Sequence, residues 1–153
     1  MSMDMGMDMD AYVATAPGVV RALRALGAAV DESGLDKGLT ELLKIRVSQL
    51  NGCAFCLQYH LNLARQHGVA AAKLDLVAAW PDAPLFSPRE RAALAWSEAL
   101  TKMGQAHVDD ALYAQLCAEF DAAEVAHLTA SVGAINAWNR IAGGLRFTPP
   151  AAA

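Results

Sequence analysis

The sequence predicts an all-α protein, a single-domain helical bundle that assembles into an oligomer. No segment shows the sustained alternation of apolar and polar residues that predicts a strand, whereas apolar residues recur every three or four positions along most of the chain. The 153 residues are enough for one domain with a buried core. Because 55% of them are hydrophobic and 18% are charged, we also expect apolar surface to be buried between subunits.

Three helices are predicted in the first part of the chain. The first covers about residues 17–31, where apolar residues are spaced by four, three and four positions: Val19, Leu23, Leu26 and Val30. Asp36 is a suitable N-cap for the second helix, which ends at the turn signal Asn51-Gly52. The third helix carries two cysteines and ends at Gly68, because glycine is the residue most often found just after a helix.

Prolines separate the fourth predicted helix from the fifth. The short fourth helix carries Leu74, Val77 and Trp80, and we expect Pro81 and Pro84 to stop it. Residues 87–90 read Ser-Pro-Arg-Glu, a capping box with proline at the first helical position. The fifth helix therefore begins at a well-defined boundary, and it runs to Gly104.

Two further helices complete the bundle. The sixth covers about residues 112–120 and contains Cys117, which we interpret as a core residue because it stands on an apolar stripe. Asp121 and Glu124 repeat the capping pattern and open a long last helix that reaches residues 143–144. Near its end, residues 138–140 read Trp-Asn-Arg and either line a site or form an interface; of the two, we favour the interface.

These helices form one domain over residues 17–146, with a flexible N-terminal tail at 1–16 and a C-terminal tail at 147–153. A formal net charge of −4 without a basic stripe argues against a nucleic-acid partner. No apolar run is long enough for a transmembrane helix, and MSMDMGMDMD lacks the basic start and apolar centre of a signal peptide. Three cysteines, two of them in a Cys-x-x-Cys pair, fit a reducing cytoplasm, so we expect a cytoplasmic protein with no membrane partner.

The residues that carry chemistry lie on both sides of the Asn51-Gly52 turn. Cys53, Cys56 and His60 are spaced by three and four positions, so they share one face of the third helix with its apolar residues. Glu41 precedes Asn51 by ten residues and His60 follows it by nine. If the two helices are antiparallel, a rise of about 1.5 Å per residue places Glu41 and His60 at the same height.

This order in space, Glu41, His60, Cys56 and then Cys53, is that of an activated nucleophile. A carboxylate orients an imidazole, and the imidazole takes the proton of a thiol. The helix N-terminus by itself favours Cys53 as the thiolate, because Cys53 stands nearer the helix end. A base in direct contact should outweigh a dipole contribution of about 0.3–1 kcal/mol, so we expect Cys56 to attack and Cys53 to resolve.

The chain resembles the AhpD-like alkylhydroperoxidases of the carboxymuconolactone decarboxylase superfamily. The residues that carry the resemblance are Glu41, Arg46-Val47-Ser48, Asn51-Gly52-Cys53-Ala54-Phe55-Cys56, His60 and Gly68, with Ser87–Glu90 and Asn136–Arg140 in addition. It implies an all-helical, oligomeric fold, thiol-dependent reduction of hydroperoxides, a proton relay of Glu41 and His60, a peroxide-attacking Cys56 and a resolving Cys53. The chain departs from the best-known peroxidases of this group at Phe55, where they have a histidine. Decarboxylases of the superfamily generally lack the cysteine pair, so we consider decarboxylation the least favoured activity.

Three other interpretations of the cysteine cluster remain. The two thiolates and His60, with Glu41 as a fourth ligand, have the chemistry of a zinc site, although no second Cys-x-x-Cys exists. The thiols could instead be buried and unreactive. A third possibility is a non-enzymatic module, for assembly or stress response, in which the disulfide only senses redox state.

The sequence therefore predicts a thiol peroxidase, or a closely related dithiol–disulfide oxidoreductase, with no bound cofactor and no metal. Its substrate is an organic hydroperoxide, and its electrons come from an external dithiol, because the sequence shows no flavin or nicotinamide fingerprint. We expect the oligomer to be a trimer or a hexamer.

Overall fold

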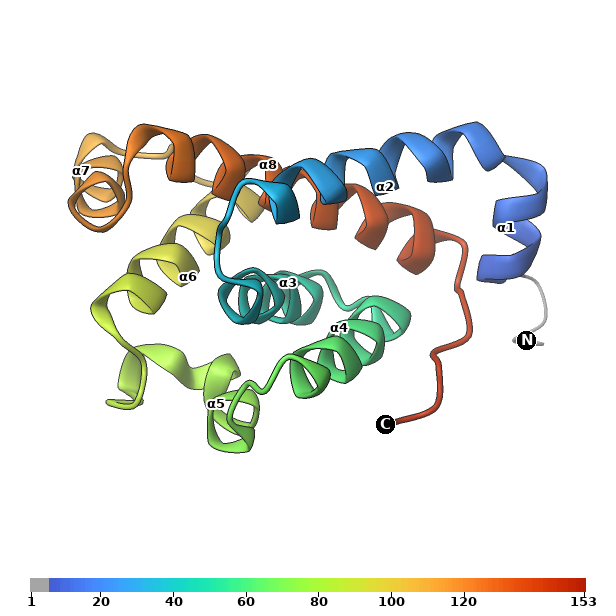
Figure 1. Ribbon diagram of the computed structural model, residues 1–153, viewed down its shortest axis with the longest axis horizontal. Coiled ribbons are helices and arrows are strands. Elements are labelled where there is room, and N and C mark those ends of the chain that lie inside the picture. Colours follow the sequence, from blue (N-terminus) through green and yellow to red (C-terminus); the bar gives the residue numbers. More distant parts are fainter. Residues whose placement is uncertain (1–5) are drawn as a thin grey trace.

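The computed structural model describes residues 6–153, and within this range every regular element is a helix (Figure 1). The predicted all-α fold is therefore confirmed. In chain order the elements are α1 (Met9–Thr15), α2 (Pro17–Glu32), α3 (Lys37–Asn51), α4 (Ala54–Gln66), α5 (Ala71–Leu76), the 3₁₀ segment η2 (Val77–Asp82), α6 (Pro88–Thr101), α7 (Asp110–Glu119), α8 (Ala122–Trp138) and the π-helical turn η3 (Asn139–Gly143).

Helix α3 is the centre of the bundle. It packs against α4, α6 and α8, while α2 lies along α8 on the opposite side of the molecule from α5 (Figure 1). The residues of α3 are buried accordingly: Leu42, Leu43, Ile45 and Val47 are almost inaccessible to solvent. A polar side chain on α3 that points inward, such as Glu41, is therefore held in a fixed and dry environment.

The capping signals in the sequence mark the helix starts correctly. The side chain of Asp36 accepts a hydrogen bond from the first turn of α3. Ser87 with Glu90 and Asp121 with Glu124 both form complete capping boxes, at the starts of α6 and α8. These boundaries depend on hydrogen bonds between residues three positions apart, which explains why the sequence alone predicts them.

A single glycine turns the chain between α3 and α4. Gly52 has φ 69°, in the left-handed region that glycine adopts without strain. The amide of Cys53 then donates back to the carbonyl oxygen of Ser48 at 3.1 Å, and Cys53 becomes the N-cap of α4. The short turn makes α3 and α4 antiparallel neighbours and fixes the start of the cysteine helix beside the end of α3.

The structure corrects the prediction of a tail at residues 1–16. Residues 9–15 form α1, whose N-cap is Asp8 and whose Tyr12 ring packs against the Phe147 ring, with centroids 5.7 Å apart and planes tilted by 53°. The sequence did not predict this helix because it is short and has no buried residue of its own. At the other end, residues 148–153 have no regular structure, while Phe147 is buried in the core. The first five residues of the predicted tail lie outside the described range.

Two other boundaries differ from the prediction. The predicted fourth helix is two segments, α5 and η2, and η2 continues through Pro81. Proline fits there because its fixed φ suits a helical turn and the backbone is already bent at Ala79 (φ −120°, ψ 32°). The predicted last helix changes at Asn139 from α-helix to a π-helical turn, a distortion that often marks functional sites.

Three residues on predicted apolar stripes are exposed: Val19, Leu26 and Cys117. Of the apolar stripe of α2, Val30 is buried but Val19 and Leu26 are 45% and 38% exposed, because α2 packs against α8 along only one side. Cys117 is exposed, since Leu116 points into the core and its neighbour on α7 therefore points away.

No single helix within residues 6–153 has both the length and the apolar content to cross a bilayer. Helices α1 and α2 reach the length and apolar composition of a membrane span only when they are taken together, and they are bent by 108° relative to each other.

Candidate active site

Glu41 and His60 are in direct contact. Oε2 of Glu41, on α3, lies 2.7 Å from Nδ1 of His60, on α4. Glu41 has no solvent-exposed surface, and the side chain of His60 is 12% exposed. The contact predicted by counting residues from the turn is therefore present, because the turn adds only Gly52 between α3 and the N-cap of α4.

Two lysines share the carboxylate of Glu41. Nζ of Lys37 lies 3.2 Å and Nζ of Lys44 lies 3.3 Å from Oε1, at spacings of four and three residues on the same helix. Burial opposes ionisation of Glu41, but the hydrogen bond from His60 and the positive charges of the lysines outweigh it and lower its pKa to about 2. The carboxylate is thus ionised at neutral pH.

His60 is neutral at neutral pH. Burial lowers its pKa below the ordinary value of 6.5, and it outweighs the opposing hydrogen bond to Glu41. Because the ionised carboxylate can only accept, Nδ1 of His60 must carry the hydrogen and donate it. The other ring nitrogen, Nε2, then has a free lone pair, so His60 can accept a proton from a neighbouring group.

Cys53 and Cys56 are joined by a disulfide at the start of α4. Sγ of Cys53 accepts a hydrogen bond from the amide of Cys56 at 3.2 Å, and Sγ of Cys56 lies 3.7 Å from the carbonyl oxygen of Trp138. Gly143 of η3 lies close to Cys53: a Cβ added there would lie 3.6 Å from the Cys53 Cβ. Both cysteines are buried, and the sequence did not indicate that η3 closes over the first of them.

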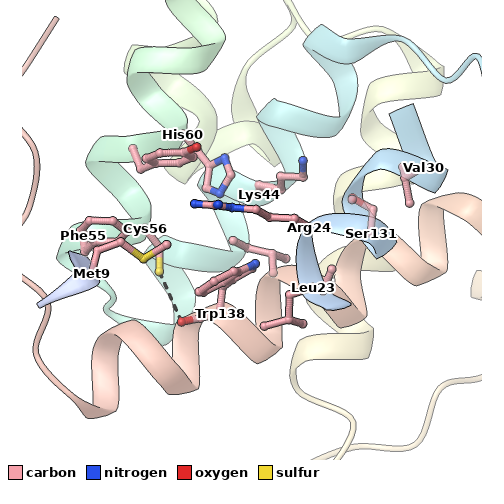
Figure 2. Close-up of a pocket in the computed structure, with 14 residues that line it drawn as sticks. Met9, Leu23, Arg24, Val30, Lys44, Phe55, Cys56, His60, Ser131 and Trp138 are labelled. Atoms are coloured by element: carbon pink, nitrogen blue, oxygen red, sulfur yellow. Dashed lines mark hydrogen bonds between the residues drawn. The ribbon is translucent and has the colours of Figure 1, made fainter. Parts of the chain in front are cut away.

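A cavity of about 230 Å³ gives access to Cys56 but not to Cys53. Figure 2 shows it between α4, which contributes Cys56 and His60, and α2 and α8. Cys53 is not among the residues that line it. A small molecule in the cavity therefore meets Cys56 and the imidazole of His60 first.

Aromatic rings surround the residue that departs from the peroxidase pattern. The ring of Phe55 stacks at 5.9 Å on Tyr59 and meets Phe147 edge-on at 5.3 Å. Tyr59 in turn contacts the His60 ring edge-on at 5.1 Å. At the position where the best-known peroxidases have a histidine, this chain has an apolar wall of the cavity, so Phe55 cannot take part in proton transfer.

The site contains several residues beyond those that the sequence pattern predicts. The lysines on Glu41 could have been found from their spacing on α3, whereas nothing in the sequence places Arg24 of α2 or Ser131 of α8 in the cavity wall. Trp138, for which an interface was favoured, lines the cavity. Its neighbour Asn139 is buried and bridges helices: it donates to Ser48 Oγ at 3.1 Å and accepts from the Asn51 side chain at 2.9 Å.

Within residues 6–153, no three side chains of histidine, cysteine, aspartate or glutamate converge as the ligands of a metal ion would. Glu41 and His60 use the atoms that face each other in their own hydrogen bond. The sulfur atoms of Cys53 and Cys56 are bonded to each other in the disulfide.

The helical fold and the Glu–His–Cys-x-x-Cys arrangement define the AhpD-like class of proteins. The model of the carboxymuconolactone decarboxylase family matches residues 17–99, and the chain belongs to this family.

Similar proteins agree with this assignment. The uncharacterized protein YdfG of Bacillus subtilis is 35% identical over 130 residues, which are 85% of this chain and 88% of that protein. The alkyl hydroperoxide reductase AhpD of Rhizorhabdus wittichii is 39% identical over 49 residues, 32% of this chain and 28% of that protein. The crystal structure of a protein of unknown function from Agrobacterium tumefaciens, a candidate AhpD, superimposes with a TM-score of 0.87 at 36% identity, covering 92% of this chain and 96% of the other.

Proposed function

We propose that this protein is a thiol peroxidase that reduces organic hydroperoxides through a dithiol–disulfide cycle of Cys53 and Cys56. The observation that carries the proposal is the buried, ionised Glu41 hydrogen-bonded to a neutral His60 on the wall of the cavity that Cys56 also lines. This arrangement supplies a base and a nucleophile at one place that a small substrate can reach.

The first step transfers oxygen to sulfur. Nε2 of His60 takes the proton of the Cys56 thiol, and Glu41 stabilises the imidazolium that forms. The Cys56 thiolate attacks the hydroxyl oxygen of the hydroperoxide, the O–O bond breaks, and the leaving alkoxide takes the proton back from His60. One hydroperoxide becomes one alcohol, and the cysteine becomes a sulfenic acid.

The second step closes the disulfide. The Cys53 thiol condenses with the Cys56 sulfenic acid, releases water and forms the bond that the structure contains. An external dithiol then reduces this disulfide by thiol exchange and is itself oxidised to a disulfide. Because this step needs a reducing environment, we propose a cytoplasmic location.

The assignment of Cys56 as the attacking residue follows from access. The amide hydrogen bond to Sγ and the N-cap position stabilise a thiolate at Cys53. A thiolate at Cys53 is nevertheless shielded by η3, whereas Cys56 borders the cavity beside His60. A hydroperoxide must reach the sulfur it oxidises, so the position of Cys56 at the cavity supports Cys56 as the attacking residue.

The test measures peroxide consumption with a panel of hydroperoxides and several dithiol donors. All variants carry Cys117→Ser, because Cys117 is exposed and would react on its own. We expect repeated turnover in the parent, none in Cys56→Ser, and a sulfenic acid on Cys56 that dimedone traps in Cys53→Ser. A single stoichiometric oxidation without turnover would identify a redox sensor instead, a sulfenic acid on Cys53 would reverse the roles, and stoichiometric zinc in the purified protein would contradict the redox function.

A further inference from the structure

The walls of the cavity beside Cys56 are mainly apolar, and the charged side chains among them are cations. Its walls include Leu23, Ile135 and Trp138, and its charged side chains within the described residues are Arg24 and Lys44. No aspartate or glutamate among residues 6–153 lines it, although the whole chain has a formal net charge of −4. The sign of the charge in the cavity is thus opposite to that of the protein as a whole.

One of these cations is not neutralised by the protein. Lys44 and Lys37 share Glu41, and Lys37 also pairs with Asp31 at 3.0 Å, so two lysines balance two carboxylates. Arg24 is exposed, and it has no ion-pair partner in the described part of the chain. Figure 2 shows its side chain extending from α2 across the cavity toward His60. A cation next to apolar walls favours an anionic ligand.

A second polar group in the cavity also lacks a partner. Ser131 is 1% exposed, and its hydroxyl has no hydrogen-bond partner among residues 6–153. An unpaired buried hydroxyl destabilises a protein by about 1–3 kcal/mol, so such groups are normally satisfied. Ser131 lies on the side of the cavity away from Cys56 (Figure 2), where a polar atom of a bound ligand would meet it.

We infer that the substrate is a hydroperoxide that carries a carboxylate on a compact apolar body, with the carboxylate facing Arg24; this rests on the peroxidase function proposed above. The volume of about 230 Å³ is slightly below the usual range of small-molecule sites, so it fits an aryl or short branched alkyl body. The rings of Trp138 and Phe55 suit an aromatic body in particular. Arg24 is then a residue that determines specificity and binds substrate without transferring protons.

The kinetic test compares two substrates of one shape. They are 4-(2-hydroperoxypropan-2-yl)benzoate and its methyl ester, which differ in charge but share the reacting group. We expect the parent to have a kcat/KM about tenfold higher for the carboxylate, the magnitude of one exposed charge-assisted hydrogen bond. Arg24→Gln should reduce this ratio and Arg24→Lys should retain most of it. Arg21→Gln is the matched control, because Arg21 is an exposed arginine of α2 outside the cavity wall.

A binding measurement separates this inference from the peroxidase function. Calorimetry with 4-isopropylbenzoate and with 4-isopropylbenzamide, on the disulfide form, needs no chemical step. Selective binding of the carboxylate that Arg24→Gln weakens and Arg21→Gln does not would support the inference, even if no hydroperoxide were reduced. Equal affinity for acid and amide, equal kcat/KM for acid and ester, or equal effects of Arg24→Gln and Arg21→Gln would overturn it.

Discussion

Replacing Glu41 by glutamine removes the charge beside His60 and keeps the shape. In the variant His60 still finds an acceptor 2.7 Å from Nδ1, but a neutral one. A hydrogen bond to a charged partner contributes about 1.5–3 kcal/mol and one between neutral groups about 0.5–1.5 kcal/mol, so the imidazolium loses about 1–2 kcal/mol. Lys44, left without its counterion, destabilises the imidazolium further, whereas Lys37 keeps its ion pair with Asp31. We therefore expect the population of the Cys56 thiolate at neutral pH to fall about tenfold to a hundredfold.

The assay is alkylation of the reduced protein by iodoacetamide, followed by mass spectrometry of the Cys56 peptide. It uses a Cys53→Ser, Cys117→Ser background, so that only Cys56 reacts. The rate should fall in Glu41→Gln, and the defect should shrink from about pH 6 to about pH 9 as hydroxide replaces the lost base. The matched control is Glu90→Gln, which removes an ion pair with Lys73 at 2.8 Å outside the cavity. If Glu41→Gln reacted at the parent rate across this range, Glu41 would be a bystander and the relay would be wrong.

Three further predictions concern stability and assembly. The pKa of Glu41 is about 2 in the folded protein and 4.5 in the unfolded chain, so the ionised carboxylate should stabilise the folded protein by on the order of 3 kcal/mol above pH 4.5. This stabilisation should be lost as the pH falls toward 2. The free energies of urea unfolding of the parent and of Glu41→Gln should therefore approach each other between pH 4.5 and 2, and a constant difference would contradict the prediction. Gly52→Ala should lower the free energy of unfolding by about 1–2 kcal/mol, because Gly52 has a positive φ. Gly133→Ala is the control and should not lower it, because Gly133 is exposed within α8 and a Cβ there would meet no other atom. Light scattering at micromolar concentration should show a trimer or hexamer, since α2 exposes Val19 and Leu26; a monomer would refute this.

The parts of the fold that follow from local interactions were predictable. The capping boxes at Ser87 and Asp121 depend on residues three positions away, and the contact of Glu41 with His60 follows from helix geometry on either side of a short turn. The predictions that were wrong concern which residues the packing of the helices buries. The exposure of Val19 and Cys117 depends on how many neighbours α2 and α7 have, which periodicity does not reveal.

The sequence by itself determined the helices and the order of Glu41, His60 and the two cysteines, and it indicated the type of chemistry that we propose. Only the tertiary structure decided which cysteine borders the cavity, because η3, at the far end of the chain, packs against Cys53 while Cys56 lines the cavity. It also brought Arg24 from α2 and Ser131 from α8 to that cavity. The spacing of residues fixes positions along one helix or across one short turn, whereas a cavity between helices distant in sequence depends on how those helices pack.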